Sequence, residues 1–303
     1  MISILGATAG GKTAIAVQLA HQLNGEVISA DSRQVYRNMD IGTGKDIKEY
    51  FVNNELIPYH LIDIVDAGYK YNVYEYQNDF LKIFEDIKSR GKYPVLCGGT
   101  GMYIEAVLKG YKLIHVPVDN ELRSELESKT DKELIEILKT HKELHNRTDT
   151  DNRKRLLRAV EIALYYEKHP EFDAMFPKIN SVIFQIIFDR NQRRERISQR
   201  LKQRMEGGMI DEVKELIDNG VDIETLKYYG LEYKFITEYL LDELSYQEMY
   251  KKLETAIHQF SKRQMTWFRK MEKDGFIIYK IDGNLPMEKK ISSIFMQLKK
   301  QTS

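Results

Sequence analysis

Residues 2–13 read Ile-Ser-Ile-Leu-Gly-Ala-Thr-Ala-Gly-Gly-Lys-Thr, and their order predicts the class of fold. The apolar run at residues 2–5 has the length and β-branched content of a short buried strand. Residues 6–13 match the pattern G-x-x-x-x-G-K-[ST] at every fixed position. The apolar-periodic segment at residues 13–23 predicts a helix, which the following Asn-Gly pair ends. Strand, glycine-rich loop and helix in this order predict a phosphate-binding loop (P-loop) in an α/β fold.

The residues of this loop suit the binding of phosphate. Backbone N–H groups of small residues can close around phosphate oxygens, and the following helix N-terminus adds partial positive charge. Lys12 would place a point charge on the terminal phosphate, and the Thr13 hydroxyl is a ligand for Mg²⁺. The motif leaves open whether the ligand is a diphosphate or a nucleoside triphosphate such as ATP. The expected phosphate-binding residues are Gly6, Ala7, Thr8, Ala9, Gly10, Gly11, Lys12 and Thr13.

Apolar segments alternate with helical segments along much of the chain, which predicts a parallel sheet. Residues 119–180 contain no convincing strand and predict a helical insertion, in which Thr130 and Glu133 form a capping box. We therefore expect residues 1–118 and 181–303 to form a P-loop α/β core with a helix-rich C-terminal region. The expected strands are residues 26–29, 60–65, 93–97, 182–188 and 275–281, and the expected helices include residues 73–90 and most of residues 191–273.

The composition is that of a globular protein, because 42% of the 303 residues are hydrophobic and 30% are charged. A single cysteine, Cys97, excludes an internal disulfide and a cysteine-rich zinc site, and it fits a reducing compartment. No apolar run reaches the ~18–20 residues that a membrane span needs. The N-terminal segment lacks the features of a signal peptide, so we expect a cytoplasmic location without membrane association.

The charges of the chain are balanced overall but clustered locally. The 46 basic and 46 acidic residues give a net charge of +0, which alone argues against nucleic-acid binding. Basic residues nevertheless gather at residues 147–158, 190–204 and 262–273. These runs are either solvated helix faces or stripes that follow phosphates. Helical spacing would place two sets on single faces: Arg193, Arg196, Arg200 and Arg204, and Lys262, Arg269 and Lys273.

Polar and small residues follow two of the predicted strands. Asp31 begins the segment Asp-Ser-Arg-Gln after residues 26–29, and Thr100 lies in Gly-Gly-Thr-Gly after residues 93–97. The carboxyl ends of parallel strands are where open α/β folds bind ligands. Asp31 could act there as a general base or metal ligand, or it could cap a helix. Asp63 is a candidate for the acidic residue that ends a strand in P-loop NTPases.

Seven segments together resemble the tRNA dimethylallyltransferase (tRNA isopentenyltransferase) family of the bacterial type. They occur in the family's order and span about nine tenths of the chain. The patterns Asp-Ser-x-Gln-x-Tyr and Lys-Arg-Gln-x-Thr-Trp-Phe-Arg are far more specific than the P-loop. The segments are residues 6–13, 28–36, 39–45, 60–63, 98–103, 151–161 and 262–269.

This resemblance implies transfer of a dimethylallyl group from dimethylallyl diphosphate to the exocyclic amine of the adenosine 3′ of the tRNA anticodon. The P-loop would hold the diphosphate rather than ATP, Asp31 would be the general base, and Thr100 would lie at the reacting centre. We expect Mg²⁺ as cofactor, the anticodon stem-loop as partner, and a monomer. The implied tRNA contacts are Asp31, Ser32, Arg33, Gln34, Thr100, Arg123, Lys154, Arg155, Leu156, Leu157, Arg158, Gly230, Lys262, Arg263, Gln264, Met265, Thr266, Trp267, Phe268 and Arg269.

The chain departs from the family's pattern at three places. Ala7 replaces the usual proline and Gly10 the usual serine, and both remain small. Gly-Leu-Glu at residues 230–232 replaces Gly-Tyr-[Lys/Arg], which puts one tRNA contact in question. Trp267 and Phe268 could stack on RNA bases, but an amphipathic helix would equally use them as core.

Three other functions remain open from the residues alone. The first is an isopentenyltransferase that acts on a free adenine nucleotide, and the second is a P-loop kinase of a small metabolite. The third is a P-loop RNA-binding module without catalysis. The basic runs and the helical insertion favour tRNA over a free nucleotide, and no lid arginines of a kinase are identifiable.

Overall fold

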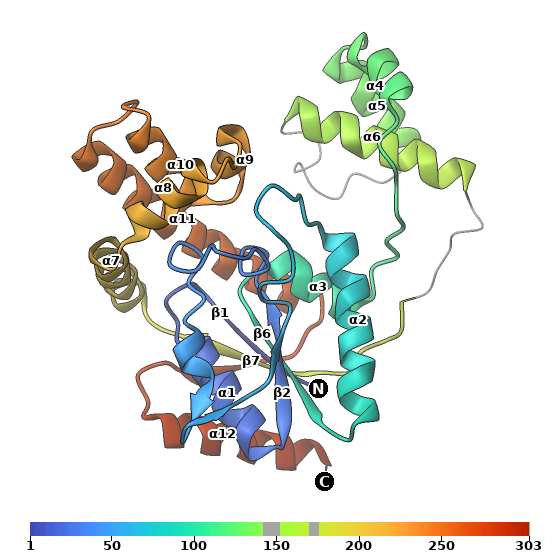
Figure 1. Cartoon of the computed structure of the whole chain (residues 1–303). Helices are drawn as coiled ribbons and strands as arrows, with labels where there is room; N and C mark the ends of the chain where they lie inside the picture. Colours follow the sequence, from blue (N-terminus) through green and yellow to red (C-terminus); the bar gives the residue numbers. More distant parts are fainter. Residues whose placement is uncertain (142–151, 170–175, 303) are drawn as a thin grey trace. The chain divides into compact units, whose positions relative to one another are not determined.

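The computed structural model describes residues 1–141, 152–169 and 176–302. Six parallel strands form one sheet in the order β5-β2-β6-β1-β7-β8, so the predicted α/β fold with a parallel sheet is confirmed (Figure 1). β1, which leads into the P-loop, lies in the middle between β6 and β7. The strands are β1 (Ile2–Gly6), β2 (Gly25–Ala30), β5 (Tyr59–His60), β6 (Tyr93–Gly98), β7 (Val182–Ile187) and β8 (Ile278–Asp282).

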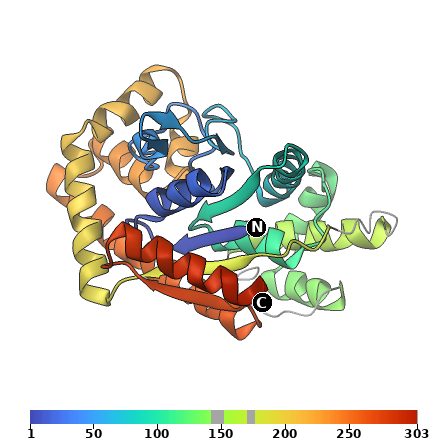
Figure 2. The same ribbon diagram turned by 90° about the horizontal axis from the view of Figure 1, so that it is seen from below.

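Helices cover both faces of this sheet, which explains why β1 and β2 are buried along their whole length (Figures 1 and 2). On one face, Ile4 of β1 and Phe184 of β7 share a buried cluster with Ile15 and Ile294. On the other face, Gln185 of β7 reaches Met265, with 3.5 Å between its Nε2 and the sulfur. The helices of the first face are α1 (Lys12–Gln22) and α12 (Met287–Thr302), and those of the second are α2 (Val73–Ser89), α3 (Gly101–Lys109) and α11 (Tyr246–Lys273).

The region after β7 is rich in helices, as the sequence predicts. Asp189 and Ser245 begin the first and last of its helices, and each side chain accepts hydrogen bonds from the backbone of the first turn. No helix in the described part of the chain is long and apolar enough to cross a membrane. The helices between β7 and β8 are α7 (Arg190–Glu206), α8 (Met209–Asp218), α9 (Ile223–Tyr228), α10 (Leu231–Leu240) and α11.

The predicted strand at residues 60–65 is wrong, because β5 contains only Tyr59 and His60. Leu61 and Asp63 have φ angles of 61° and 55°, in the left-handed region, so the extended backbone cannot continue through them. The apolar side chains of Leu61 and Ile62 are still buried. The apolar residues in this segment are therefore buried as part of a turn and not as part of a strand.

Residues 111–177 form a separate compact unit of helices, whereas the sequence predicts an insertion at residues 119–180. The earlier start follows from contacts of the connecting segment, because Arg158 donates to the Val116 carbonyl and Tyr166 to that of Lys112, each at 2.7 Å. The expected capping box is present, since the Thr130 backbone N–H donates to the Glu133 carboxylate at 2.7 Å. The helices are α4 (Asn120–Glu127), α5 (Asp131–His141) and α6 (Arg153–Lys168), around a core of Leu126, Leu134, Leu138, Leu156 and Val160.

Candidate phosphate and acceptor site

The P-loop adopts a tight turn ahead of α1. Gly11 has a φ of 66°, a conformation that favours glycine at the start of the helix. A Cβ at Gly10 would lie 2.9 Å from the Ala7 carbonyl oxygen, so a side chain there would displace the loop. Lys12 Nζ donates to the same carbonyl at 2.9 Å, and burial lowers the pKa of Lys12. The Lys12 ammonium group therefore lies inside the turn of the P-loop, where it is bound to the backbone.

The register of the sheet brings three strand ends to one edge. Gly98 at the end of β6 is paired with Leu5 of β1 on one side and with Ala30 of β2 on the other. The P-loop, the segment after Ala30 and the segment after Gly98 therefore leave the sheet together. Thr100 joins the last two, because its backbone N–H donates to the Ala30 carbonyl at 3.1 Å and its Oγ1 accepts from the Ser32 N–H at 3.0 Å.

Asp31 lies in this junction, and its carboxylate shapes a turn. Asp31 Oδ1 accepts the backbone N–H of Arg33 at 2.9 Å. No helix follows, since residues 31–38 form turns and a single bridge, so the interpretation of Asp31 as a helix cap is wrong. Asp31 is only partly buried. A carboxylate held this way beside Thr100 and the P-loop could accept a proton from a bound ligand.

Gln264 and Trp267 of α11 contact the loops at this sheet edge, and Gln264 joins the P-loop to the Thr100 segment. Gln264 accepts the Thr8 backbone N–H and donates to the Gly99 carbonyl, both at 2.9 Å, and it is only 8% exposed. The indole of Trp267 lies against Gly101, where a Cβ would overlap the ring. Gln264 binds backbone groups of these loops, and Trp267 can approach only because Gly101 has no side chain. The glycine-rich Gly-Gly-Thr-Gly segment thus gives α11 close access to the sheet edge.

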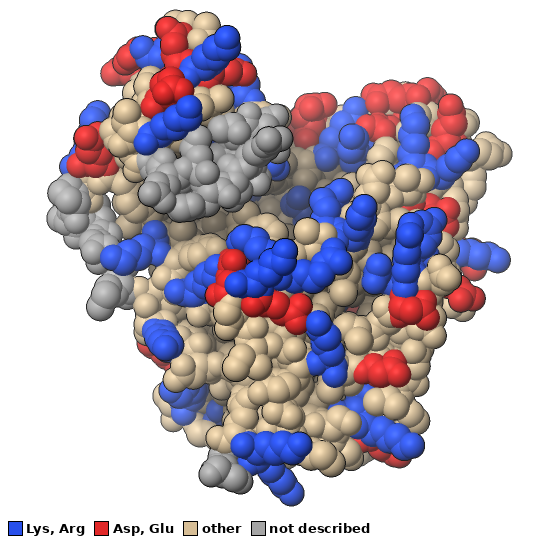
Figure 3. Space-filling view, turned by 180° about the vertical axis from the view of Figure 1, so that it is seen from behind, with Lys and Arg blue, Asp and Glu red and all other residues tan. Residues whose placement is uncertain are grey.

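The other residues expected on α11 divide between core and surface. Phe268 has no exposed surface, so the interpretation of this ring as an RNA stacker is wrong and the core interpretation holds. Met265 contacts Gln185 of the sheet. Figure 3 shows a band of Lys and Arg side chains, interrupted by a few acidic ones, across one face of the protein. The exposed residues of the segment are Lys262, Arg263, Thr266 and Arg269.

The arginine stripe of α7 lies beside the P-loop. Arg196 Nε donates to the Ala9 carbonyl at 3.0 Å, and Arg200 pairs with Asp46 at 2.8 Å. Arg204 is deeper, and burial together with the nearby Arg200 lowers its pKa to about 10. From the sequence, this stripe is expected to be either a solvated face or a phosphate track along RNA. The structure places much of it at the phosphate loop instead.

Glu49 adds a carboxylate beside the P-loop that sequence reasoning missed. It lies in the short helix η1 (Ile47–Tyr50), near Thr13 and Lys12 of the P-loop. Partial burial and Asp46 raise the pKa of Glu49, whereas Arg200 and Lys12 lower it. No group of three or more acidic, histidine or cysteine residues suited to a metal occurs among the described residues. Mg²⁺ commonly takes one or two protein oxygens and completes its shell with phosphates, so Thr13 and Glu49 fit it.

A turn at residues 39–45 is bound to the C-terminal helices through Glu212. The Glu212 carboxylate accepts the backbone N–H groups of Asp40, Ile41 and Gly42 at 2.6–3.0 Å, and Tyr233 donates to it at 2.7 Å. No local pattern marks Glu212 for this role. The backbone groups that it binds lie about 170 positions earlier in the chain.

The same turn carries a buried lysine whose partners include Asp63. Lys45 Nζ pairs with Asp63 and with Asp40, and it donates to the Tyr36 carbonyl at 2.6 Å. Asp63 therefore supports this turn, and it follows no strand beyond His60. The hypothesis of a strand-ending acid of the P-loop NTPase kind does not fit this geometry.

The unusual Glu232 lies next to the P-loop. It lines a narrow cavity of about 10 Å³ together with Thr8, Arg200 and Arg204. Burial raises the pKa of Glu232, whereas Arg204 and Arg200 lower it. The glutamate therefore faces arginines of α7, which explains how an acid is tolerated at this position.

In the helical unit, the expected tRNA residues again fall into two groups. Arg123 and Arg158 bind the buried Glu161 at 2.8 and 2.6 Å, and their hydrogen bonds lower the pKa of Glu161 although burial opposes them. Leu156 is fully buried, so its side chain cannot touch RNA, and Leu157 is partly buried against the same core. Lys154 and Arg155 are exposed. Arg147 and Asp151 lie outside the described residues.

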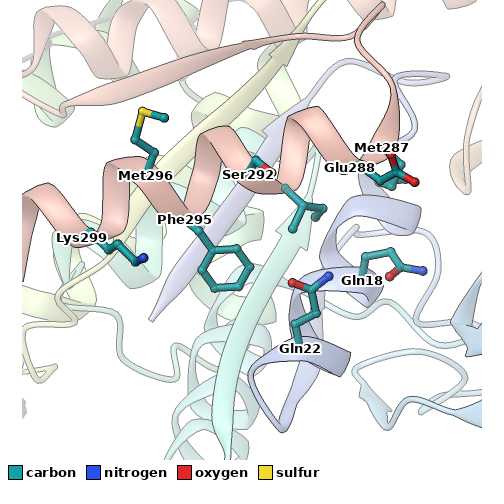
Figure 4. Close-up of a pocket in the computed structure, with 9 residues that line it drawn as sticks. Gln18, Gln22, Met287, Glu288, Ser292, Phe295, Met296 and Lys299 are labelled. Carbon is teal, nitrogen blue, oxygen red and sulfur yellow. The ribbon is translucent and has the colours of Figure 1, made fainter.

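A larger pocket lies elsewhere in the main unit. It has a volume of about 520 Å³ and is lined by residues of α1 and α12, with Phe295 pointing toward Gln22 (Figure 4). Gln18 and Gln22 belong to the second half of α1, whereas the P-loop ends in the first turn of that helix. This pocket is therefore separate from the strand-end site.

These observations define an α/β protein with a P-loop motif and a carboxylate at the same sheet edge, which together form a candidate site for a phosphate ligand and an acceptor. The family model described as IPP transferase matches residues 34–271, and the one described as Isopentenyl transferase matches residues 1–59. The chain belongs to the IPP transferase family, and the resemblance seen in the motifs is confirmed.

Individual relatives align along almost the whole chain. It is 56% identical over 299 residues to tRNA dimethylallyltransferase 2 of Bacteroides fragilis, covering 99% of this chain and 98% of the relative. It is 57% identical over 301 residues to tRNA dimethylallyltransferase 1 of Parabacteroides distasonis, covering 99% and 98%. The crystal structure of the full-length tRNA isopentenylpyrophosphate transferase from Bacillus halodurans superposes with a TM-score of 0.71 at 32% identity, covering 98% and 94% of the two chains.

Proposed function

We propose that this protein transfers a dimethylallyl group from dimethylallyl diphosphate to N6 of the adenosine immediately 3′ of the tRNA anticodon. The observation that carries the proposal is the meeting of a P-loop with Asp31 and Thr100 at one sheet edge. A diphosphate and an acceptor amine can react there, because the P-loop would hold the diphosphate and Asp31 would face the amine within the same site. Membership in the IPP transferase family and the names of the relatives support the same conclusion.

In the reaction, the C–O bond of the allylic diphosphate breaks and a C–N bond to adenine forms. Negative charge develops on the leaving diphosphate, where backbone N–H groups of the P-loop and Lys12 stabilise it. Arg196 and Arg200 add positive charge on the same side. Mg²⁺, held through Thr13 and Glu49 together with phosphate oxygens, would supply further charge neutralisation.

Asp31 completes the reaction by accepting a proton from the adenine amine. The lone pair of that amine is delocalised into the ring, so its attack is assisted by removal of the proton as the new bond forms. Such general-base assistance is worth roughly 10²–10⁴-fold in rate. Thr100 holds the Asp31 turn through Ser32, and it lies next to the place where the two substrates meet.

The tRNA would contact the exposed basic residues of α11, and Lys154 and Arg155 of the helical unit. Phosphate contacts of this kind position the RNA, while the reacting base must leave its stack to reach Asp31. We propose that the protein works in the cytoplasm, where unmodified tRNA is found, and as a monomer. Arg123 and Arg158 would act indirectly, because both are held by Glu161.

A single incubation tests this function against its rivals. The protein is mixed with Mg²⁺, dimethylallyl diphosphate and unmodified tRNA, with AMP or ATP as alternative acceptors, and nucleosides are analysed by mass. A dimethylallyl mass gain on tRNA adenosine alone is the expected result. Gain on the free nucleotide would establish the runner-up, and no gain on any acceptor would favour a kinase or an RNA-binding module.

A further inference from the structure

An exposed tyrosine lies near Asp31, the residue proposed to face the acceptor amine, and the proposed reaction does not use it. Tyr228, the last residue of α9, is 52% exposed, and the Arg33 guanidinium lies 5.2 Å from the centroid of its ring. Arg33 Nη2 also donates to the Tyr228 carbonyl at 2.9 Å. The backbone N–H of the same arginine donates to Asp31 Oδ1. One residue therefore connects the exposed ring to the carboxylate proposed as general base.

Buried aromatic rings support Tyr228 from within. The ring of Tyr229 lies 6.1 Å from that of Tyr228 in an edge arrangement and 4.3 Å from that of Tyr36. Tyr229 and Tyr36 have no exposed surface. The Tyr229 hydroxyl accepts the Gly68 N–H and donates to the Tyr69 carbonyl. The exposed ring thus rests on a hydrogen-bonded, close-packed base.

The buried side chain of Tyr103 responds to both ends of this arrangement. It is 5% exposed, and its pKa is raised by burial and further by Tyr36, Tyr228 and Asp31, whereas Arg33 lowers it. The geometric link between the exposed ring and the carboxylate is Arg33, which contacts the Tyr228 ring and donates its backbone N–H to Asp31. The ring and the carboxylate therefore belong to one neighbourhood at the sheet edge.

We propose that the Tyr228 ring, with Arg33 against it, is a stacking platform for an unpaired nucleobase of the RNA next to the reacting adenosine. Aromatic rings and guanidinium planes bind unpaired bases by stacking. Extrusion of the reacting base deprives its neighbour of a stacking partner, and the platform replaces that partner. A free nucleotide has no neighbouring base, so the platform favours RNA. This inference rests on the proposed function.

Substitutions of the ring test the platform. Tyr228→Ala is expected to raise KM for an anticodon stem-loop about tenfold. Tyr228→Leu, which keeps bulk over Tyr229, should resemble the alanine variant, and Tyr228→Phe should resemble the wild type. KM for dimethylallyl diphosphate should not change in any of them. The matched control is Tyr246→Ala, an exposed tyrosine at the start of α11, which should leave all constants unaltered.

Stem-loops with one abasic site identify the base that stacks. At one loop position beside the acceptor, base removal should weaken binding to the wild type but should not weaken binding to Tyr228→Ala any further. Equal losses in both proteins at every position, or an unchanged KM for Tyr228→Ala, would overturn the platform alone. Absence of dimethylallyl transfer by the wild-type protein would overturn the proposed function and the platform together.

Discussion

Asp31 has a structural contact and a proposed role in proton transfer, and one substitution can remove the second while keeping the first. Its Oδ1 accepts the Arg33 N–H, and an asparagine oxygen can accept the same bond. Asp31→Asn should therefore keep the turn but lose the basic carboxylate. We expect kcat to fall by roughly 10²–10⁴-fold while the Kd for tRNA stays the same. Single-turnover rates and filter binding measure the two quantities.

The matched control for this substitution is Asp211→Asn, at an exposed position in the first turn of α8. It should retain the wild-type rate. A near-normal rate of Asp31→Asn would assign the proton transfer to another group. Loss of tRNA binding in parallel with the rate would assign Asp31 to recognition.

Gln264 is the second residue whose contacts predict a measurable effect. Gln264→Leu would leave the Thr8 N–H and the Gly99 carbonyl without partners, which costs about 1–3 kcal/mol for each buried group. We expect a lower melting temperature and a raised KM for dimethylallyl diphosphate, because the P-loop loses its tie to the Thr100 segment. Gln247→Leu, an exposed glutamine on the same helix, should change neither. An unaltered diphosphate KM in Gln264→Leu would show that the loop holds its shape without α11.

Among the elements, β2 and the end of α2 are joined through a buried carboxylate. Hydrogen bonds from Arg90 lower the pKa of Glu26 to about 2, with a further contribution from His60, although burial opposes them. Because the folded pKa is below the ordinary value of 4.5, this contact stabilises the protein fully above about pH 4.5. The stabilisation disappears as the pH falls toward 2, and the shift corresponds to about 3 kcal/mol.

Glu26→Gln tests this linkage. The variant should be less stable than the wild type near neutral pH, and the difference in the free energy of unfolding should shrink between pH 4.5 and 2. Chemical denaturation at several pH values measures it. Glu85→Gln, an exposed position on α2, serves as control. A difference that stays constant with pH would mean that packing, rather than charge, explains the destabilisation.

Elements that depend on local patterns were the easiest to predict. The strand, loop and helix at residues 2–23 follow from their own order of residues, and the capping residues mark the starts of several helices. Residues 60–65 misled the prediction, because an apolar run in a turn is buried by its neighbours as thoroughly as a strand. Periodicity reports burial, and only the backbone angles of Leu61 and Asp63 distinguish the two cases.

For the molecule as a whole, the balanced net charge hides a surface suited to RNA. The exposed basic residues of α11 predict tRNA binding that weakens steeply with salt, since phosphate contacts release counterions. Lys262→Ala and Arg269→Ala should each reduce the slope of log Kd against log salt by about one. Binding measured over a salt series checks this.

The control for the salt series is Lys214→Ala on α8, where the lysine pairs with Asp218 on the surface. It should leave the slope unchanged. A slope that is flat in the wild type, or unaffected by both α11 substitutions, would remove α11 from the tRNA interface.

The sequence alone predicts the local motifs of this protein, because a P-loop, a strand-ending aspartate and a basic helix each depend on neighbours within a few residues. It does not predict how these motifs come together in space. The parallel register places Gly6, Asp31 and Thr100 at one edge, and Gln264 reaches Thr8 across 256 positions of chain. Such contacts depend on how helices pack against the finished sheet. Spacing along a chain carries no record of them, so Tyr228, Glu49 and Glu212 became visible only in three dimensions.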